Sequence, residues 1–151
     1  MSETMFTGIV QCTGGVADVC GHAGGVRLIV EAGELTRHAK TGDSICVSGV
    51  CLTVAALTPG HFEFDVIRET LDKTMLGQLR GGNRVNLEPS LCASDRMDGH
   101  FVQGHVDGTA TVQRVVATAN EYVLWLRPQA HLLPYIIPKG SIALDGVSLT
   151  V

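Results

Sequence analysis

Two short stretches of the sequence each carry a pair of small side chains that end in a thiol or a hydroxyl. In "SGVCLTV", a strand with alternating faces places Cys51 and Thr53 on one side and the apolar residues between them on the other. The apolar side is expected to face the core, so the polar pair points to solvent, a ligand or a partner. In "GVSLTV", Ser148 and Thr150 take the same two places. A lone hydroxyl on a strand surface is usually structural, but its repetition favours a functional site.

The stretch "DGHFVQGHVDG" holds two histidines, His100 and His105. Five residues apart on an extended run, they point to opposite faces and are poor ligands for one metal ion. His105 follows Gly104, which allows a close backbone approach to a flat ligand, and its imidazole can carry a proton near neutral pH. The alternative is a half-buried histidine with a purely structural role.

Four further polar residues lie at expected turns. Strand 61–67 is expected to be followed by a short helix that ends at Gly77. Glu69 and Thr70 fall in its first turn, where free N–H groups bind ligand oxygens or are simply capped. Lys139 lies in a rigid "PKG" turn that presents one cation, either to a ligand or to solvent. Asp145 precedes a glycine and fits an ordinary turn.

The chain contains an internal repeat. "SICVSGVCLTV" (44–54) matches "SIALDGVSLTV" (141–151) at seven of eleven positions, and "FTGIVQ" and "LIVEA" have weaker echoes at nearly the same offset. We therefore expect one domain over residues 1–97 and the first half of a second copy over residues 98–151. Counterparts of "HFEFDVIRETL" and "GNRVNLEPSL" are missing from the second copy, so the sequence is expected to be truncated.

Each repeat is expected to be built from short strands. In "HFEFDVI", apolar and acidic residues alternate, and the neighbouring stretches are β-branched runs separated by glycines. The stretch "DSICVSGVCLTVAAL" is expected to form two short strands with a break at Ser48–Gly49. About six strands and one or two short helices per 95 residues favour an all-β fold of two tandem six-stranded Greek-key barrels, the second incomplete. A β-sandwich is the alternative on pattern alone.

Composition narrows the function classes. The net charge is −4 with Lys and Arg scattered singly, which argues against nucleic-acid binding. No apolar run is long enough to span a membrane and the N-terminus does not resemble a signal peptide, so a cytoplasmic protein is expected. The five cysteines include no C-x-x-C pair, and Cys12, Cys20 and His22 match no common metal spacing. We expect no metal.

Together, "MFTGIVQ", "GVCLTV", "RETL", "RVNLE", "GHFVQGHVDGT" and "PKGSIALDGVSLTV" resemble the riboflavin synthase α-chain family over residues 5–151. The resemblance implies two tandem barrels followed by a helix that joins three chains. It implies a homotrimer for a full-length chain, and we expect a homodimer for a truncated one. The family pattern differs here at Ser48, Met75 and Asp98.

The implied reaction is a dismutation. Two molecules of 6,7-dimethyl-8-ribityllumazine exchange a four-carbon unit and give riboflavin and 5-amino-6-ribitylaminouracil, without a metal or a redox cofactor. One lumazine loses a proton from its C7 methyl group, and the other is attacked at C7. Such chemistry requires mainly that two flat rings are held face to face.

The resemblance also implies the site residues. Catalytic roles fall on Cys51, His105, Ser148, Asp145 and Thr150, with His105 and Ser148 as a proton-handling pair and Cys51 as a transient nucleophile or polar contact. One substrate face is expected to consist of Gly8, Ile9, Val10, Cys51, Leu52, Thr53, Asp65, Val66, Ile67, Arg68, Glu69 and Thr70. The second is expected to consist of Gly104, His105, Val106, Lys139, Ser148, Leu149 and Thr150.

Two other function classes fit the same residues less well. A non-catalytic lumazine- or flavin-binding protein would use the same barrels but would not need the polar set of the second repeat. A purely structural barrel would not need the repeated polar pairs.

Overall fold

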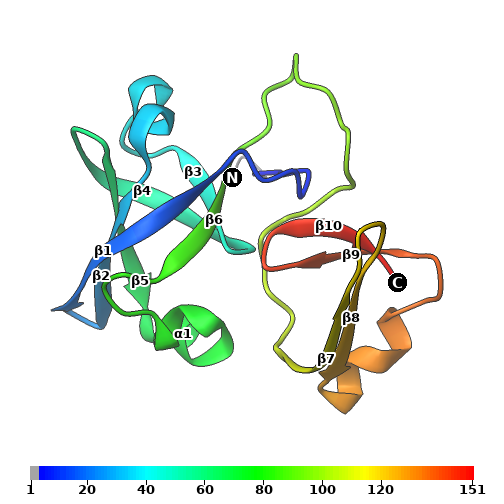
Figure 1. Ribbon diagram of the computed structural model, residues 1–151. Helices are drawn as coiled ribbons and strands as arrows, with labels where there is room; N and C mark the ends of the chain where they lie inside the picture. The colour runs from blue at the N-terminus through cyan, green and yellow to red at the C-terminus, as the bar shows by residue number, and fades with distance from the viewer. Residues whose placement is uncertain (1–3) are drawn as a thin grey trace.

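The first repeat closes into a six-stranded antiparallel barrel. The computed structural model describes residues 4–151, and Figure 1 shows the barrel as one half of the molecule. Its strands follow the order β1-β2-β5-β4-β3-β6 around the barrel. Their bounds are β1 Cys12–His22, β2 Gly25–Glu31, β3 Ser44–Val47, β4 Val50–Thr58, β5 His61–Ile67 and β6 Arg84–Pro89. The barrel prediction is confirmed, and a sandwich is excluded for this repeat.

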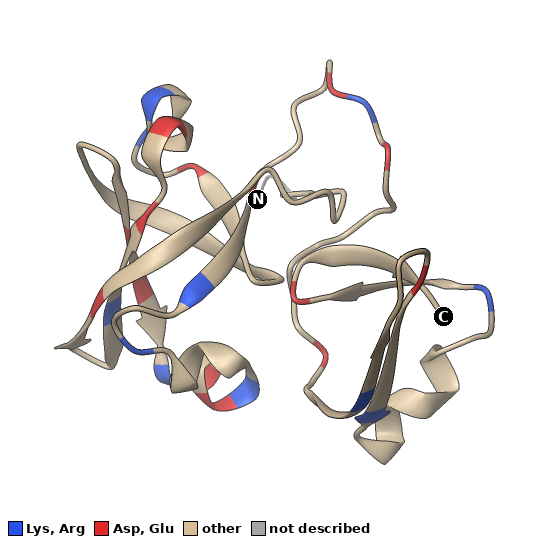
Figure 2. Cartoon of the chain, viewed as in Figure 1, with Lys and Arg blue, Asp and Glu red and all other residues tan. Residues whose placement is uncertain are grey.

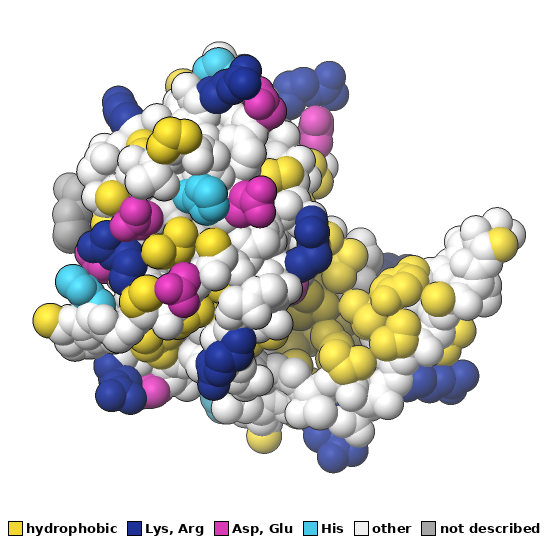
Figure 3. Space-filling view, turned by 60° about the vertical axis from the view of Figure 1, so that its left-hand side comes forward, with side chains coloured by type: hydrophobic (Ala, Val, Ile, Leu, Met, Phe, Trp, Pro, Cys, Tyr) yellow, Lys and Arg dark blue, Asp and Glu magenta, His cyan; other side chains and the backbone are white. Residues whose placement is uncertain are grey.

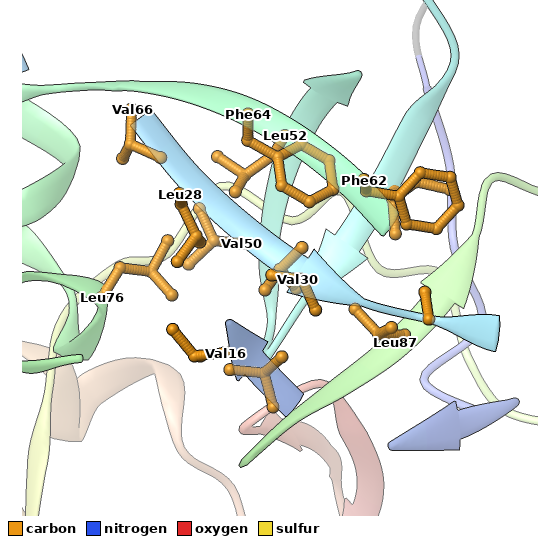
Figure 4. Packing of buried hydrophobic residues seen from close by; sticks show 14 of the residues in the cluster. Val16, Leu28, Val30, Val50, Leu52, Phe62, Phe64, Val66, Leu76 and Leu87 are labelled. Carbon is orange, nitrogen blue, oxygen red and sulfur yellow. The ribbon is translucent and has the colours of Figure 1, made fainter. Parts of the chain in front are cut away.

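Alternation along the strands produces the barrel core. On β5, Phe62, Phe64 and Val66 are at most 2% exposed, while the acidic residues between them face outward. Inward-facing aliphatic residues from all six strands pack around the two phenylalanines, whose ring centroids are 5.8 Å apart (Figure 4). Close packing of this kind makes each large core side chain costly to shorten.

Three short helical segments close the ends of the barrel. They are η1 Gly33–His38, α1 Arg68–Lys73 and η2 Met75–Gln78. The sequence predicted a single helix up to Gly77, but the chain breaks at Thr74, whose hydroxyl accepts the amide of Leu76 and starts a separate 3-10 turn. Leu76 is thereby turned into the core at 3% exposure.

The second repeat consists of two hairpins over the described residues. Strands β7 Ala110–Ala117 and β8 Tyr122–Pro128 form one, and β9 Ser141–Leu144 and β10 Val147–Thr150 form the other, with η3 Ala130–Tyr135 between them. These hairpins repeat β1–β2 and β3–β4 in detail: β1 has a bulge between Val16 and Asp18, and β7 has one between Val112 and Arg114. The repeat read from the sequence is therefore also a repeat of backbone geometry.

The second repeat leaves much apolar surface exposed. Figure 3 shows hydrophobic side chains gathered in a hollow beside the barrel, and Figure 2 shows acidic and basic residues distributed over both repeats. The large apolar side chains exposed in this repeat include Val112, Val115, Tyr122, Trp125, Leu133 and Ile137. Within residues 4–151, no helix has both the length and the apolar character required to cross a membrane.

Several contacts join the repeats. Phe6 and Val102 form an isolated antiparallel bridge with N–O distances of 2.8 and 3.0 Å, and both side chains are buried. Strand β6 also contacts the β9–β10 turn, because the side-chain amide of Asn86 donates to the carbonyl and the carboxylate of Asp145 at 2.9 and 3.0 Å. The repeats are therefore packed against each other by the segment that precedes β1 and by the outer face of β6.

The core predicts a clear stability difference between two substitutions. Replacing the fully buried Phe64 by alanine should lower the free energy of unfolding by about 3–5 kcal/mol, because it removes transfer energy and leaves a cavity. Met75→Ala, at a side chain 49% exposed, should change it by only about 0.5 kcal/mol. Urea unfolding followed by circular dichroism measures both. Equal effects would contradict the packing described.

Candidate functional site

The β3–β4 hairpin presents Cys51 and Thr53 on the outer face of the barrel. Val50, Leu52 and Val54 are buried in the core, as the alternation predicted, whereas Cys51 is half-buried and Thr53 exposed. Burial raises the pKa of the Cys51 thiol, and a hydrogen bond with Ser44 opposes this effect. Cys51 is therefore a neutral thiol near pH 7, which suits a hydrogen-bonding role better than that of a preformed nucleophile.

A pocket of about 160 Å³ opens beside Cys51. Its walls come from β4, from α1 and from the segment that begins the second repeat. The lining residues are Val50, Cys51, Glu69, Thr70, Lys73, Thr74, Gly104, His105 and Val106. Glu69 and Lys73 form an ion pair of 2.7 Å at its rim. Six of the predicted site residues thus meet in one place, drawn from both repeats.

Glycine is required where the second-repeat segment crosses Cys51. The carbonyl of Gly104 accepts the amide of Cys51 at 2.9 Å, and a Cβ on Gly104 would lie 2.7 Å from the Cβ of Cys51. Gly104 also has a φ of +76°, which L-residues with a side chain rarely adopt. This close approach fixes His105 at the pocket wall.

The same arrangement recurs with the repeats exchanged. Gly8 has the same φ of +76°, its carbonyl accepts the amide of Ser148 at 2.8 Å, and a Cβ there would lie 2.8 Å from the Cβ of Ser148. Each repeat therefore lays its N-terminal segment across the polar pair of the other repeat.

This exchange corrects the expected grouping of the site. Gly8 was assigned to the Cys51 face and Gly104 to the Ser148 face, but the structure pairs Gly8 with Ser148 and Gly104 with Cys51. The reason is the Phe6–Val102 bridge, which directs each segment toward the opposite repeat. Sequence alignment of the repeats cannot reveal such a crossing.

The expected pairing of Ser148 is also different. Its hydroxyl lies 2.7 Å from Nδ1 of His100, whereas His105 lines the pocket at Cys51. His105 and Ser148, which were expected to form a proton-handling pair, lie apart within this chain, because the exchange places them beside different repeats. Their catalytic roles remain predictions. The sequence did not indicate that His100 contacts Ser148. It did indicate that His100 and His105 point to opposite faces, and in the structure the two histidines lie at different sites.

Asp145 lies at the junction of the two hairpin turns. Its φ is +53°, its carboxylate is held by Asn86, and burial raises its pKa while a hydrogen bond with Ser48 opposes the shift. In this position Asp145 joins the repeats, and it does not line the Cys51 pocket.

The other predicted site residues are dispersed. Leu52 and Val66 are buried in the core, and Asp65 forms hydrogen bonds of 2.6 and 3.0 Å with Arg27 on the outer wall. The remaining ones are mostly exposed or half-buried and lie outside the Cys51 pocket; they are Ile9, Val10, Thr53, Ile67, Arg68, Lys139, Leu149 and Thr150. A larger pocket of about 550 Å³, lined by Gly33, Leu57 and Gly60 among others, contains none of the predicted residues.

Comparison with known proteins identifies the family. The profile of the "Lumazine binding domain" matches residues 7–90 and 103–151. Riboflavin synthase of Bacillus subtilis is 42% identical over 149 residues, which cover 97% of this chain and 68% of the relative. Riboflavin synthase of Schizosaccharomyces pombe is 44% identical, with coverage of 97% and 72%. The chain belongs to the riboflavin synthase family.

Solved structures agree with this assignment to a lumazine-binding fold. LumP in complex with 6,7-dimethyl-8-(1'-D-ribityl) lumazine superposes with a TM-score of 0.84 at 25% identity, covering 96% of this chain and 78% of LumP. LumP in complex with riboflavin superposes with a TM-score of 0.83 at 24% identity. The sequence is thus closer to these family synthases than to LumP, which supports the enzyme over the non-catalytic alternative.

The raised thiol pKa predicts how Cys51 reacts with iodoacetamide. Alkylation requires the thiolate, so Cys51 should react slowly at pH 7 and faster as the pH rises above about 8.5, the value for a free cysteine. Cys46, where burial raises the pKa to about 12, should stay unmodified at pH 9. Peptide mapping by mass spectrometry, with the exposed Cys92 as reference, measures each rate. Fast modification of Cys51 at pH 7 would refute the assignment of a neutral thiol.

Proposed function

We propose that this protein is a riboflavin synthase that converts two molecules of 6,7-dimethyl-8-ribityllumazine into riboflavin and 5-amino-6-ribitylaminouracil. The observation that carries the proposal is the pocket that joins Cys51 of one repeat to His105 of the other, in a chain 42% identical to a synthase over 97% of its length. Because a four-carbon unit passes from one substrate to the other, the enzyme class is a transferase. We place the reaction in the cytoplasm.

The pocket residues suit the proton movements of this reaction. The reaction requires that one lumazine loses a proton from its C7 methyl group and that the other lumazine is attacked at C7. His105, at the pocket wall, is placed to carry a proton, and the neutral Cys51 thiol is placed to donate a hydrogen bond to a ring atom. Glu69 and Thr70 face the same space from α1 and can orient the ribityl chain. The other residues for which we propose catalytic roles, Ser148, Asp145 and Thr150, lie in the second repeat.

The size of the pocket bears on how two substrates meet. Ligand pockets are commonly about 300–1,000 Å³, so a pocket of about 160 Å³ covers only part of one substrate. A second surface must therefore cover the remaining ring face. We propose that another chain supplies it, in a homotrimer when the protein is full length or a homodimer for a truncated form. Within the chain, we propose the division into domains 1–97 and 98–151.

Turnover is tested by incubating the protein with 6,7-dimethyl-8-ribityllumazine and following flavin absorbance. Riboflavin should form. His105→Ala should lower kcat by about 100-fold or more, the usual contribution of a general acid–base group. Cys51→Ser should lower it by about tenfold, because a hydroxyl keeps the hydrogen bond. Glu34→Gln, at an exposed carboxylate on η1, is the matched control and should leave kcat unchanged.

Two outcomes would overturn parts of this proposal. Tight lumazine binding without riboflavin formation would show a non-catalytic binding protein on the same fold. Full activity of both His105→Ala and Cys51→Ser would remove the Cys51 pocket from the mechanism.

A further inference from the structure

Glu88 is a buried carboxylate outside the proposed pocket. It lies on β6 and is 5% exposed. One carboxylate oxygen accepts the amide of Thr7 and the hydroxyl of Thr7, both at 2.7 Å, and the other accepts the amide of Gly8 at 3.0 Å. Charged acceptors make the stronger hydrogen bonds, and a buried carboxylate with three donors is well stabilised.

The two residues that Glu88 binds, Thr7 and Gly8, also hold His100 and Ser148 of the second repeat. The carbonyl of Thr7 accepts the amide of His100 at 3.0 Å, and the carbonyl of Gly8 accepts the amide of Ser148 at 2.8 Å. His100 Nδ1 and Ser148 Oγ then lie 2.7 Å apart. Both members of this pair are thus anchored through their backbones to the two residues that Glu88 holds.

We propose that Glu88 is a positioning residue, which sets the geometry of the His100–Ser148 pair through the backbone of Thr7 and Gly8. The inference deepens the proposed function and rests on it for the catalytic consequence. Glu88 belongs to the first repeat and the pair to the second, so one repeat organises a polar pair that it does not itself contain.

Hydrogen-bond cooperativity gives the proposal a physical mechanism. The Thr7 carbonyl and the Gly8 amide belong to the same peptide group. When the carboxylate accepts the N–H of that group, it polarises the C=O and makes it a better acceptor for the His100 amide. The negative charge of Glu88 therefore strengthens the bond to His100 as well as fixing where the peptide lies.

If Glu88 served only to stabilise the barrel, its hydrogen-bond donors would be expected on the barrel strands. Its three donors instead come from residues 7 and 8, which precede β1. The core-facing residues of β6, Val85 and Leu87, are buried independently of this carboxylate. Loss of the Glu88 charge should therefore act on segment 7–8 and its second-repeat contacts more than on the barrel.

Amide hydrogen exchange measured by NMR on Glu88→Gln separates the two roles without relying on activity. The neutral amide has nearly the same shape, but its NH₂ cannot accept the third hydrogen bond. The amides of His100 and Ser148 should exchange at least tenfold faster, while those of Val30 and Phe64 in the barrel stay unchanged. Glu34→Gln is again the control. If Glu88→Gln does not fold, Thr7→Val removes one donor to the carboxylate and should accelerate exchange at the same two amides.

The kinetic consequence is read from a double-mutant cycle. Glu88→Gln should lower kcat for riboflavin formation by about tenfold with little change in KM, and it should have no further effect in a Ser148→Ala background. Equal acceleration of exchange at all amides, no change at His100 and Ser148, or additive losses in the cycle would each overturn the inference. Absence of riboflavin formation by the unaltered protein would refute the proposed function, and the exchange result would still decide the role of Glu88.

Discussion

The organisation of this molecule depends on one reciprocal backbone contact. The carbonyl of Gly8 accepts the amide of Ser148, and the carbonyl of Gly104 accepts the amide of Cys51, at 2.8 and 2.9 Å. Neither contact leaves room for a Cβ on the glycine. The pocket at Cys51 follows from this exchange, because it joins the segment around Gly104 to β4 of the first repeat. The link from Glu88 to the His100–Ser148 pair follows from it as well, because Thr7 and Gly8 of the first repeat bind the backbone of both second-repeat residues.

Local patterns predicted the barrel well. The alternation of Phe62, Phe64 and Val66 gave the inward face of β5, and the Ser48–Gly49 break gave the β3–β4 hairpin. These features depend on side-chain period and turn chemistry, which are local properties of the sequence. The split of the predicted helix at Thr74 was missed, since it depends on a single hydroxyl-to-amide bond that no periodicity reveals.

The sequence singled out residues that line the pocket, but it did not show which of the predicted residues contact each other. Cys51, Glu69, Thr70, Gly104, His105 and Val106 do come together, whereas Ser148 turned out to face His100. The burial of Glu88 could not be predicted from the sequence, because a glutamate at an outward-facing position of β6 is expected to be exposed to solvent. Its carboxylate is bound by Thr7 and Gly8, which lie 81 and 80 residues away in the sequence. Contacts between residues so far apart in sequence are tertiary, and the alternation of apolar and polar residues along a strand does not predict them.

The symmetry of the crossing has an evolutionary consequence. Gly8 and Gly104 make the same backbone contact, each with the opposite repeat. This symmetry would arise if an ancestral protein exchanged the segment with a second copy of itself and its gene was then duplicated and fused. The two crossings differ in their chemistry, because position 51 carries a thiol and position 148 a hydroxyl, whereas neither glycine leaves room for a side chain.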